Sequence, residues 1–103
     1  MIAYKTIIMK SHIEVLYDPR YFKDREEFET IIYEIQERHE AWFYARINPV
    51  SGLAPDKIYN FYRYFYDENH DIALFLDDEL HPDIRKECRE AFDSVFLTVE
   101  KHS

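Results

Sequence analysis

Two segments with apolar side chains at helical spacing constrain the fold of this 103-residue chain more than any other feature. The apolar stripe of the first segment, Asp24–Trp42, consists of Phe28, Ile31, Ile32, Ile35, His39 and Trp42. The stripe of the second segment, which follows Pro82, consists of Ile84, Cys88, Ala91, Phe92, Val95, Phe96 and Val99. A repeat near 3.6 residues is typical of a helix that buries one face, so we expect two amphipathic helices. Asp24, with Glu27 three residues on, is the expected cap of the first helix, and Pro82 suits the first turn of the second.

Short runs rich in β-branched and aromatic residues predict strands around these helices. The predicted strands are Ile2–Met9, His12–Asp18, Phe43–Ile47, Lys57–Tyr66 and Ile72–Leu76. The first two are either separate strands joined by a tight turn or one strand with a bulge. Asp67–Asp71 is the expected hairpin turn, in which Asn69 suits a left-handed backbone conformation.

This order of elements predicts an α+β fold, β(β)αβββα, formed by residues 1–103 as a single compact domain. An antiparallel sheet of four to five strands would carry the two amphipathic helices packed on one of its faces.

Charge and composition narrow the classes of partner. The net charge of −8 is repelled by nucleic acid and by anionic membranes, so we expect neither as a direct partner. The single glycine argues against phosphate-binding loops and dinucleotide fingerprints, and we expect no cofactor. One cysteine, Cys88, excludes an intramolecular disulfide, and a cytoplasmic location is the simplest interpretation.

One segment combines aromatic residues with carboxylates. No Lys or Arg lies between Arg63 and Arg85, whereas this stretch is rich in Asp and Glu. Tyrosine supplies large amphipathic contact area and is enriched at interfaces. We therefore predict a partner-binding surface formed by Tyr62, Tyr64, Tyr66, Asp67, Glu68, Asp71, Asp77, Asp78 and Glu79. Which aromatic row of Lys57–Tyr66 is exposed stays open, because both faces of that run are aromatic.

The sequence contains only weak evidence for catalytic or metal sites. The spacing Asp67-x-Asn69-x-Asp71 matches the opening of a calcium-binding loop, but Ile72 stands where such a loop needs glycine. His70 and His81 lie near carboxylates and could form a transition-metal site, although at no recognised spacing. Cys88 and His39 lie on apolar stripes, which favours a structural thiol and a hydrogen-bonded core histidine. We therefore expect neither a catalytic constellation nor an enzyme.

No motif identifies a family. The profile, short, acidic and rich in tyrosine, is similar in kind to that of immunity proteins and phage-encoded inhibitors. This similarity implies a small binding protein that neutralises a basic toxin, nuclease or nucleic-acid-binding protein by occluding its positive cleft. The alternatives are a metal-assisted hydrolase that uses His70, His81 and neighbouring carboxylates, and a structural or adaptor protein that self-associates, for example as a homodimer.

Overall fold

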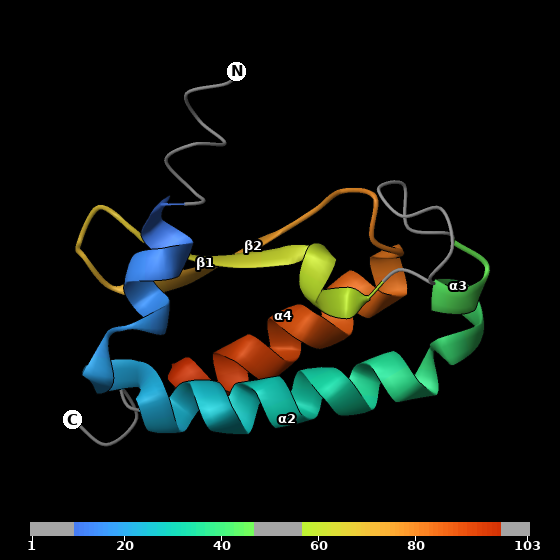
Figure 1. Cartoon of the computed structure of the whole chain (residues 1–103), viewed down its shortest axis with the longest axis horizontal. Helices are drawn as coiled ribbons and strands as arrows, with labels where there is room; N and C mark the ends of the chain where they lie inside the picture. The colour runs from blue at the N-terminus through green and yellow to red at the C-terminus, as the bar shows by residue number, and fades with distance from the viewer. Residues whose placement is uncertain (1–9, 47–56, 98–103) are drawn as a thin grey trace.

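The computed structural model describes residues 10–46 and 57–97, and all structural statements below refer to them. Residues 10–16 are helical. The elements that follow are the 3-10 helix η1 (Pro19–Tyr21), α2 (Phe22–Arg38), α3 (Glu40–Tyr44), the 3-10 helix η2 (Ile58–Asn60), β1 (Tyr62–Tyr66), β2 (Ile72–Leu76) and α4 (Pro82–Phe96). In Figure 1, α2 and α4 lie side by side and cover one face of the β1–β2 hairpin.

The hairpin is antiparallel, with Tyr64 opposite Leu74 and Tyr66 opposite Ile72. An isolated two-stranded hairpin is marginal in water and needs to pack against another element. Here the packing partners are the two helices, which bury Phe28, Ile32 and Ile35 from α2 and a longer stripe from α4. The α4 residues buried in this core are Ile84, Cys88, Ala91, Phe92, Val95 and Phe96.

Phe28 is the centre of this core. Its ring makes edge-on contacts with Tyr62 and Tyr64 of β1 and with Phe92 and Phe96 of α4, at centroid distances of 5.7 to 6.1 Å. Edge-to-face pairs at such distances are the favourable geometry for aromatic rings. One residue of α2 therefore joins the hairpin to the second long helix.

The predicted sheet of four to five strands is wrong, because the described residues contain one two-stranded sheet and more helices than the expected two. The predicted strand Ile2–Met9 lies outside these residues. The predicted strand His12–Asp18 is largely helical. Val15 is buried, whereas Ile13 and Tyr17, which the alternating pattern would have buried with it, are exposed. In so short a run, the spacing of His12, Val15 and Leu16 fits a helix equally well.

This helical segment packs against the free edge of β1. His12 Nδ1 accepts the Tyr64 N–H at 3.0 Å, and the two rings stack with centroids 5.4 Å apart. A side chain thus occupies the β1 position at which a further strand would bond. Covering an exposed edge is a common way to prevent unwanted strand pairing.

The predicted strand Phe43–Ile47 is also wrong, because α3 continues to Tyr44 after a break in the helix at His39. Phe43 is buried against the rings of Trp42 and Phe61, at 5.0 and 6.2 Å. Burial of this ring overrides the local preference of aromatic residues for strands.

The predicted strand Lys57–Tyr66 begins later than expected. Its first part forms η2, and only Tyr62–Tyr66 pairs with β2. The Ile58 N–H donates to Gln36 Oε1 at 2.8 Å, so a side chain of α2 takes the bond that a neighbouring strand would make. Ile72–Leu76, by contrast, is the strand that the sequence predicts.

Two local predictions shift by a few residues. Helix α2 begins at Phe22, before the expected cap Asp24, and Asp18 caps the preceding turn by accepting the Arg20 N–H. In the hairpin turn His70, not Asn69, has a positive φ of 63°. Its ring stacks on Tyr66, with the ring centroids 4.4 Å apart. Pro82 lies in the first turn of α4, as expected.

Candidate partner-binding surface

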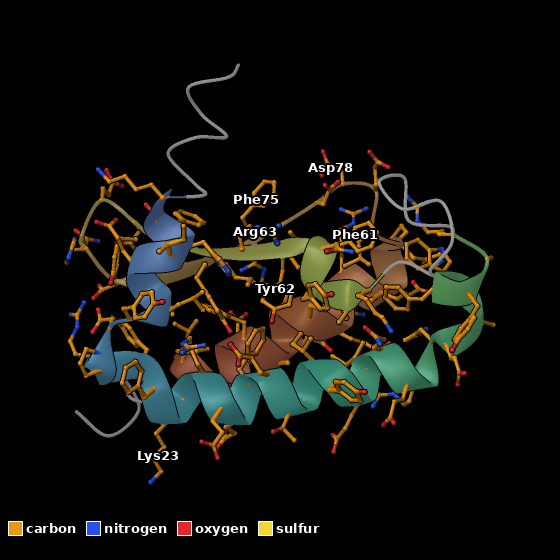
Figure 2. All side chains as sticks on the ribbon, viewed as in Figure 1. Lys23, Phe61, Tyr62, Arg63, Phe75 and Asp78 are labelled. Atoms are coloured by element: carbon orange, nitrogen blue, oxygen red, sulfur yellow. The ribbon has the colours of Figure 1, made fainter. Side chains whose placement is uncertain are left out.

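The two faces of the hairpin have different roles. Tyr62 and Tyr64 point towards the helices and are buried, so the structure places their rings out of a partner's reach. Figure 2 shows Tyr62 between the hairpin and α2, while Phe75 and Asp78 lie on the opposite side. The register puts Arg63, Phe65, Ala73 and Phe75 on the outer face. The sequence left open which aromatic row is exposed. The structure places Phe65 on the outer face, where it is half-buried, whereas Phe61 of the same predicted row is buried.

Two hydroxyls of the inner row are paired with carboxylates. Tyr64 donates to Glu29 Oε2 and Tyr66 donates to Asp18 Oδ2, each at 2.7 Å. Burial and then the nearby negative charge raise the pKa of both phenols, so these hydroxyls stay protonated donors. Hydrogen bonds from Arg20 and then Tyr66 hold the pKa of the Asp18 carboxyl well below its usual range. These tyrosines therefore serve the fold.

The predicted acidic residues separate into two groups, one at each end of the hairpin (Figure 1). Asp67, Glu68 and Asp71 form the turn between β1 and β2, whereas Asp77, Asp78 and Glu79 follow β2 at the far end. Five residues per strand separate the groups by roughly 16 Å. The acids therefore frame the hairpin and do not form one continuous patch.

Several of these carboxylates have structural partners. Asp67 Oδ1 accepts the N–H groups of Asn69 and Asp71, and Asp77 Oδ1 accepts the N–H of Glu79. Such bonds are typical of Asx turns. Glu79 pairs with Arg46 at 3.3 Å. The carboxylates of Glu68, Asp71 and Asp78 are exposed and are the members of the predicted set that remain available to a partner.

The two histidines of the metal alternative do not converge. His70 lies in the hairpin turn, whereas His81 is at the other end, where its Nδ1 accepts the Asp83 N–H and caps α4. Within residues 10–46 and 57–97, no group of three or more His, Cys, Asp or Glu residues is arranged to hold a metal ion. Asp67 Oδ1, the first predicted calcium ligand, is directed at backbone N–H groups of its own turn.

Cys88 has the surroundings that the sequence indicates, whereas His39 is hydrogen-bonded as expected but does not lie in the core. Cys88 is fully buried, and burial raises the pKa of its thiol to about 12. His39 Nε2 lies within hydrogen-bonding distance of Glu87 Oε2, and Arg38 pairs with the other carboxylate oxygen. His39 is only partly buried, so it belongs to the α2–α4 boundary and not to the centre of the core.

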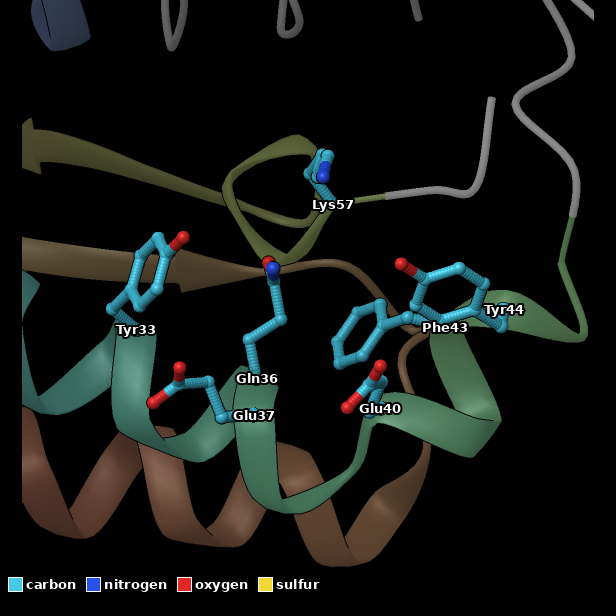
Figure 3. Close-up of a pocket in the computed structure, with 7 residues that line it drawn as sticks. All are labelled: Tyr33, Gln36, Glu37, Glu40, Phe43, Tyr44 and Lys57. Carbon is cyan, nitrogen blue, oxygen red and sulfur yellow. The ribbon is translucent and has the colours of Figure 1, made fainter. Parts of the chain in front are cut away.

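The sequence analysis missed a pocket at the break between α2 and α3. Its walls include Tyr33 and Tyr44, residues that are 62% and 64% exposed, and its volume is about 200 Å³. In Figure 3, Glu37, Glu40 and Lys57 lie around the same hollow, with Gln36 and Phe43 between the two tyrosines. The one residue whose position in the sequence could have indicated this pocket is Tyr33. It lies off the apolar stripe of α2 and therefore had to face solvent.

Comparisons with models of known protein families, with characterised proteins and with solved structures found no match to this chain. None of the helices formed by residues 10–46 and 57–97 is long and apolar enough to cross a membrane.

Proposed function

We propose that this chain is a small acidic binding protein that neutralises a basic protein by covering its positively charged surface. The observation that supports this function is the outer face of the hairpin, where Phe65 and Phe75 lie half-exposed between the acidic groups at its two ends. Large rings in the middle of a contact and charges around its rim are the usual arrangement at protein interfaces.

The mechanism has two stages. The carboxylates of Glu68, Asp71 and Asp78 attract a basic surface before contact, which raises the rate of association. The rings of Phe65 and Phe75 then dock, and their burial slows dissociation. The proposal includes a cytoplasmic location and a partner of the toxin, nuclease or nucleic-acid-binding class.

The test compares two triple variants with the same change in charge. The first replaces Glu68, Asp71 and Asp78 with Lys, and the control replaces Glu27, Glu34 and Glu90, which are exposed on α2 and α4. Basic proteins are captured from source cells on the immobilised wild-type chain, purified, and measured for association rate at several salt concentrations. We expect the hairpin variant to associate at least about tenfold more slowly at low salt. The difference should shrink near physiological ionic strength, where charges are screened over about 8 Å.

Two results would contradict the proposal. In the first, the control variant associates as slowly as the hairpin variant, which would mean that net charge alone, and not the hairpin surface, sets the association rate. In the second, the captured proteins are not basic, or they bind the hairpin variant as fast as the wild type.

A further inference from the structure

The base of the pocket at the break between α2 and α3 is held by a hydrogen bond and by buried aromatic rings. The Ile58 N–H donates to Gln36 Oε1 at 2.8 Å and ties η2 to α2 beside the pocket. Phe43, at the bottom, is buried and packs on Trp42 and Phe61. The base of the pocket is therefore formed before any ligand binds, which lowers the entropic cost of binding.

The charges of the pocket leave one negative charge uncompensated. Glu37 and Glu40 line it and are exposed, and neither carboxylate has a hydrogen-bond or ion-pair partner in the described part of the chain. Among the lining residues that the structure describes, Lys57 is the single cation, and its ammonium group makes no ion pair with either carboxylate. Two carboxylates and one ammonium group give a net charge of −1, which a ligand with one positive charge would balance.

The walls of the pocket suit a flat cation. The faces of tyrosine rings attract ammonium and guanidinium groups, and guanidinium groups also stack on them. The chain already uses this combination internally, because Arg20 lies 4.9 Å from the centre of the Tyr21 ring while it pairs with Asp18 at 2.7 Å. Arg46 likewise lies 5.0 Å from the Trp42 ring centre and pairs with Glu79.

The size of the pocket excludes a large ligand but fits one side chain. Its volume of about 200 Å³ is below the roughly 300–1,000 Å³ of pockets for drug-sized ligands. A neighbouring hollow of about 350 Å³ shares Tyr33, Gln36 and Lys57 with it and extends to Tyr59. A polypeptide lying along this second hollow could therefore place one side chain in the first.

We propose that the pocket between Tyr33 and Tyr44 binds an arginine side chain of a partner protein, with Glu37 and Glu40 pairing with its guanidinium group. Arginine fits better than lysine, because a planar guanidinium group stacks on tyrosine and bonds carboxylates through two N–H groups at once. The source of the arginine rests on the proposed function, which assigns a basic partner to this chain. The chemistry of the pocket can be tested separately with a small probe.

The probe is N-acetyl-L-arginine amide, titrated into the whole chain while the ring signals of Tyr33 and Tyr44 are followed by NMR. Its matched control is N-acetyl-L-citrulline amide, which has nearly the same shape without the charge, and N-acetyl-L-lysine amide tests the preference for guanidinium. We expect saturable shifts with the arginine probe, weaker binding of the lysine probe and no saturable shift with citrulline.

Protein variants test whether Glu37 and Glu40 supply the negative charge that binds the arginine probe. The pair Glu37→Gln and Glu40→Gln should weaken binding of the arginine probe at least about tenfold, the equivalent of about 1.4 kcal/mol. The control pair, Glu27→Gln and Glu34→Gln, removes the same charge from exposed positions of α2 outside the pocket and should change the affinity less than about twofold. The comparison of the three probes uses only the wild-type chain, so it tests the pocket even if a variant fails to fold.

The pocket assignment is overturned if citrulline shifts the Tyr33 and Tyr44 signals as arginine does, if lysine binds as tightly, or if both glutamate pairs weaken binding equally. The two proposals can fail separately. If the hairpin variant loses partner association but the wild-type chain does not bind the arginine probe, only the pocket assignment is overturned. Saturable arginine binding by a chain that captures no basic protein contradicts the proposed function alone.

Discussion

The Tyr64 hydroxyl donates a hydrogen bond of 2.7 Å to Glu29 Oε2 and so links β1 to α2 across 35 positions of sequence. The same oxygen accepts a bond of 2.8 Å from Arg25, whose guanidinium also donates to the Leu16 carbonyl at 3.1 Å. One carboxylate thus joins the hairpin, α2 and the helical segment of residues 10–16. The network is partly buried, since the Glu29 side chain is 38% exposed, and hydrogen bonds to a charged group are stronger than those between neutral groups.

We predict that Tyr64→Phe lowers the free energy of unfolding by about 1.5–3 kcal/mol, because it removes a hydrogen bond to a charged group. The measurement is urea denaturation at pH 7. Tyr59→Phe is the control, since Tyr59 is exposed and its change should stay within about 0.5 kcal/mol. Equal stability of the two variants would contradict a structural role for the Tyr64–Glu29 bond.

The second prediction concerns His12, whose Nδ1 accepts the Tyr64 N–H only when this nitrogen carries no proton. Burial lowers the pKa of His12 below its usual 6.5, as do Arg63 and Arg25, whereas Glu29 acts in the opposite direction. The folded state therefore binds this proton less readily than the unfolded state. The resulting stability is present above pH 6.5 and is lost as the pH falls from 6.5 towards the lower pKa of the folded protein.

We expect the wild-type chain to lose stability relative to His12→Gln as the pH falls from 7.5 to 5. Glutamine keeps a hydrogen-bond acceptor but does not titrate. Thermal melts of both proteins at matched pH values measure the difference, and NMR titration of His12 gives the pKa directly. A pKa at or above 6.5, or parallel stability curves for the two proteins, would refute this role of His12.

The third prediction concerns Phe28. Its replacement by Ala should lower the free energy of unfolding by about 3–5 kcal/mol, because a large buried ring leaves a cavity between four aromatic neighbours. Phe22→Ala is the matched control on the same helix, since Phe22 is 49% exposed. Denaturant unfolding should show only a small loss of stability for Phe22→Ala. Similar losses of stability for both variants would contradict the central position of Phe28 in the core.

Much of the secondary structure could be predicted where one pattern dominated a long segment. The stripes of α2 and α4 repeat over several turns, and no strand could bury their members on one side. Ile72–Leu76 is short, but the turn residues before it mark its beginning. In contrast, His12–Asp18 and Phe43–Ile47 are too short for a pattern to separate helix from strand, and contacts with Tyr64 and Phe61 decided their structure.

The candidate site was less predictable, because it depends on residues that are distant in sequence. The sequence by itself determined the charge of the chain, the acidic segment beyond Arg63 and the surplus of tyrosine. It could not determine which face of Tyr62–Tyr66 is buried, since both faces are aromatic and local hydrophobicity barely distinguishes them. Tertiary structure decided this through Glu29 and Asp18, which accept the hydroxyls of Tyr64 and Tyr66 and make burial of that row favourable. Tertiary structure also decided the pocket, because the break in the helix at His39 places Tyr33 and Tyr44 around one hollow.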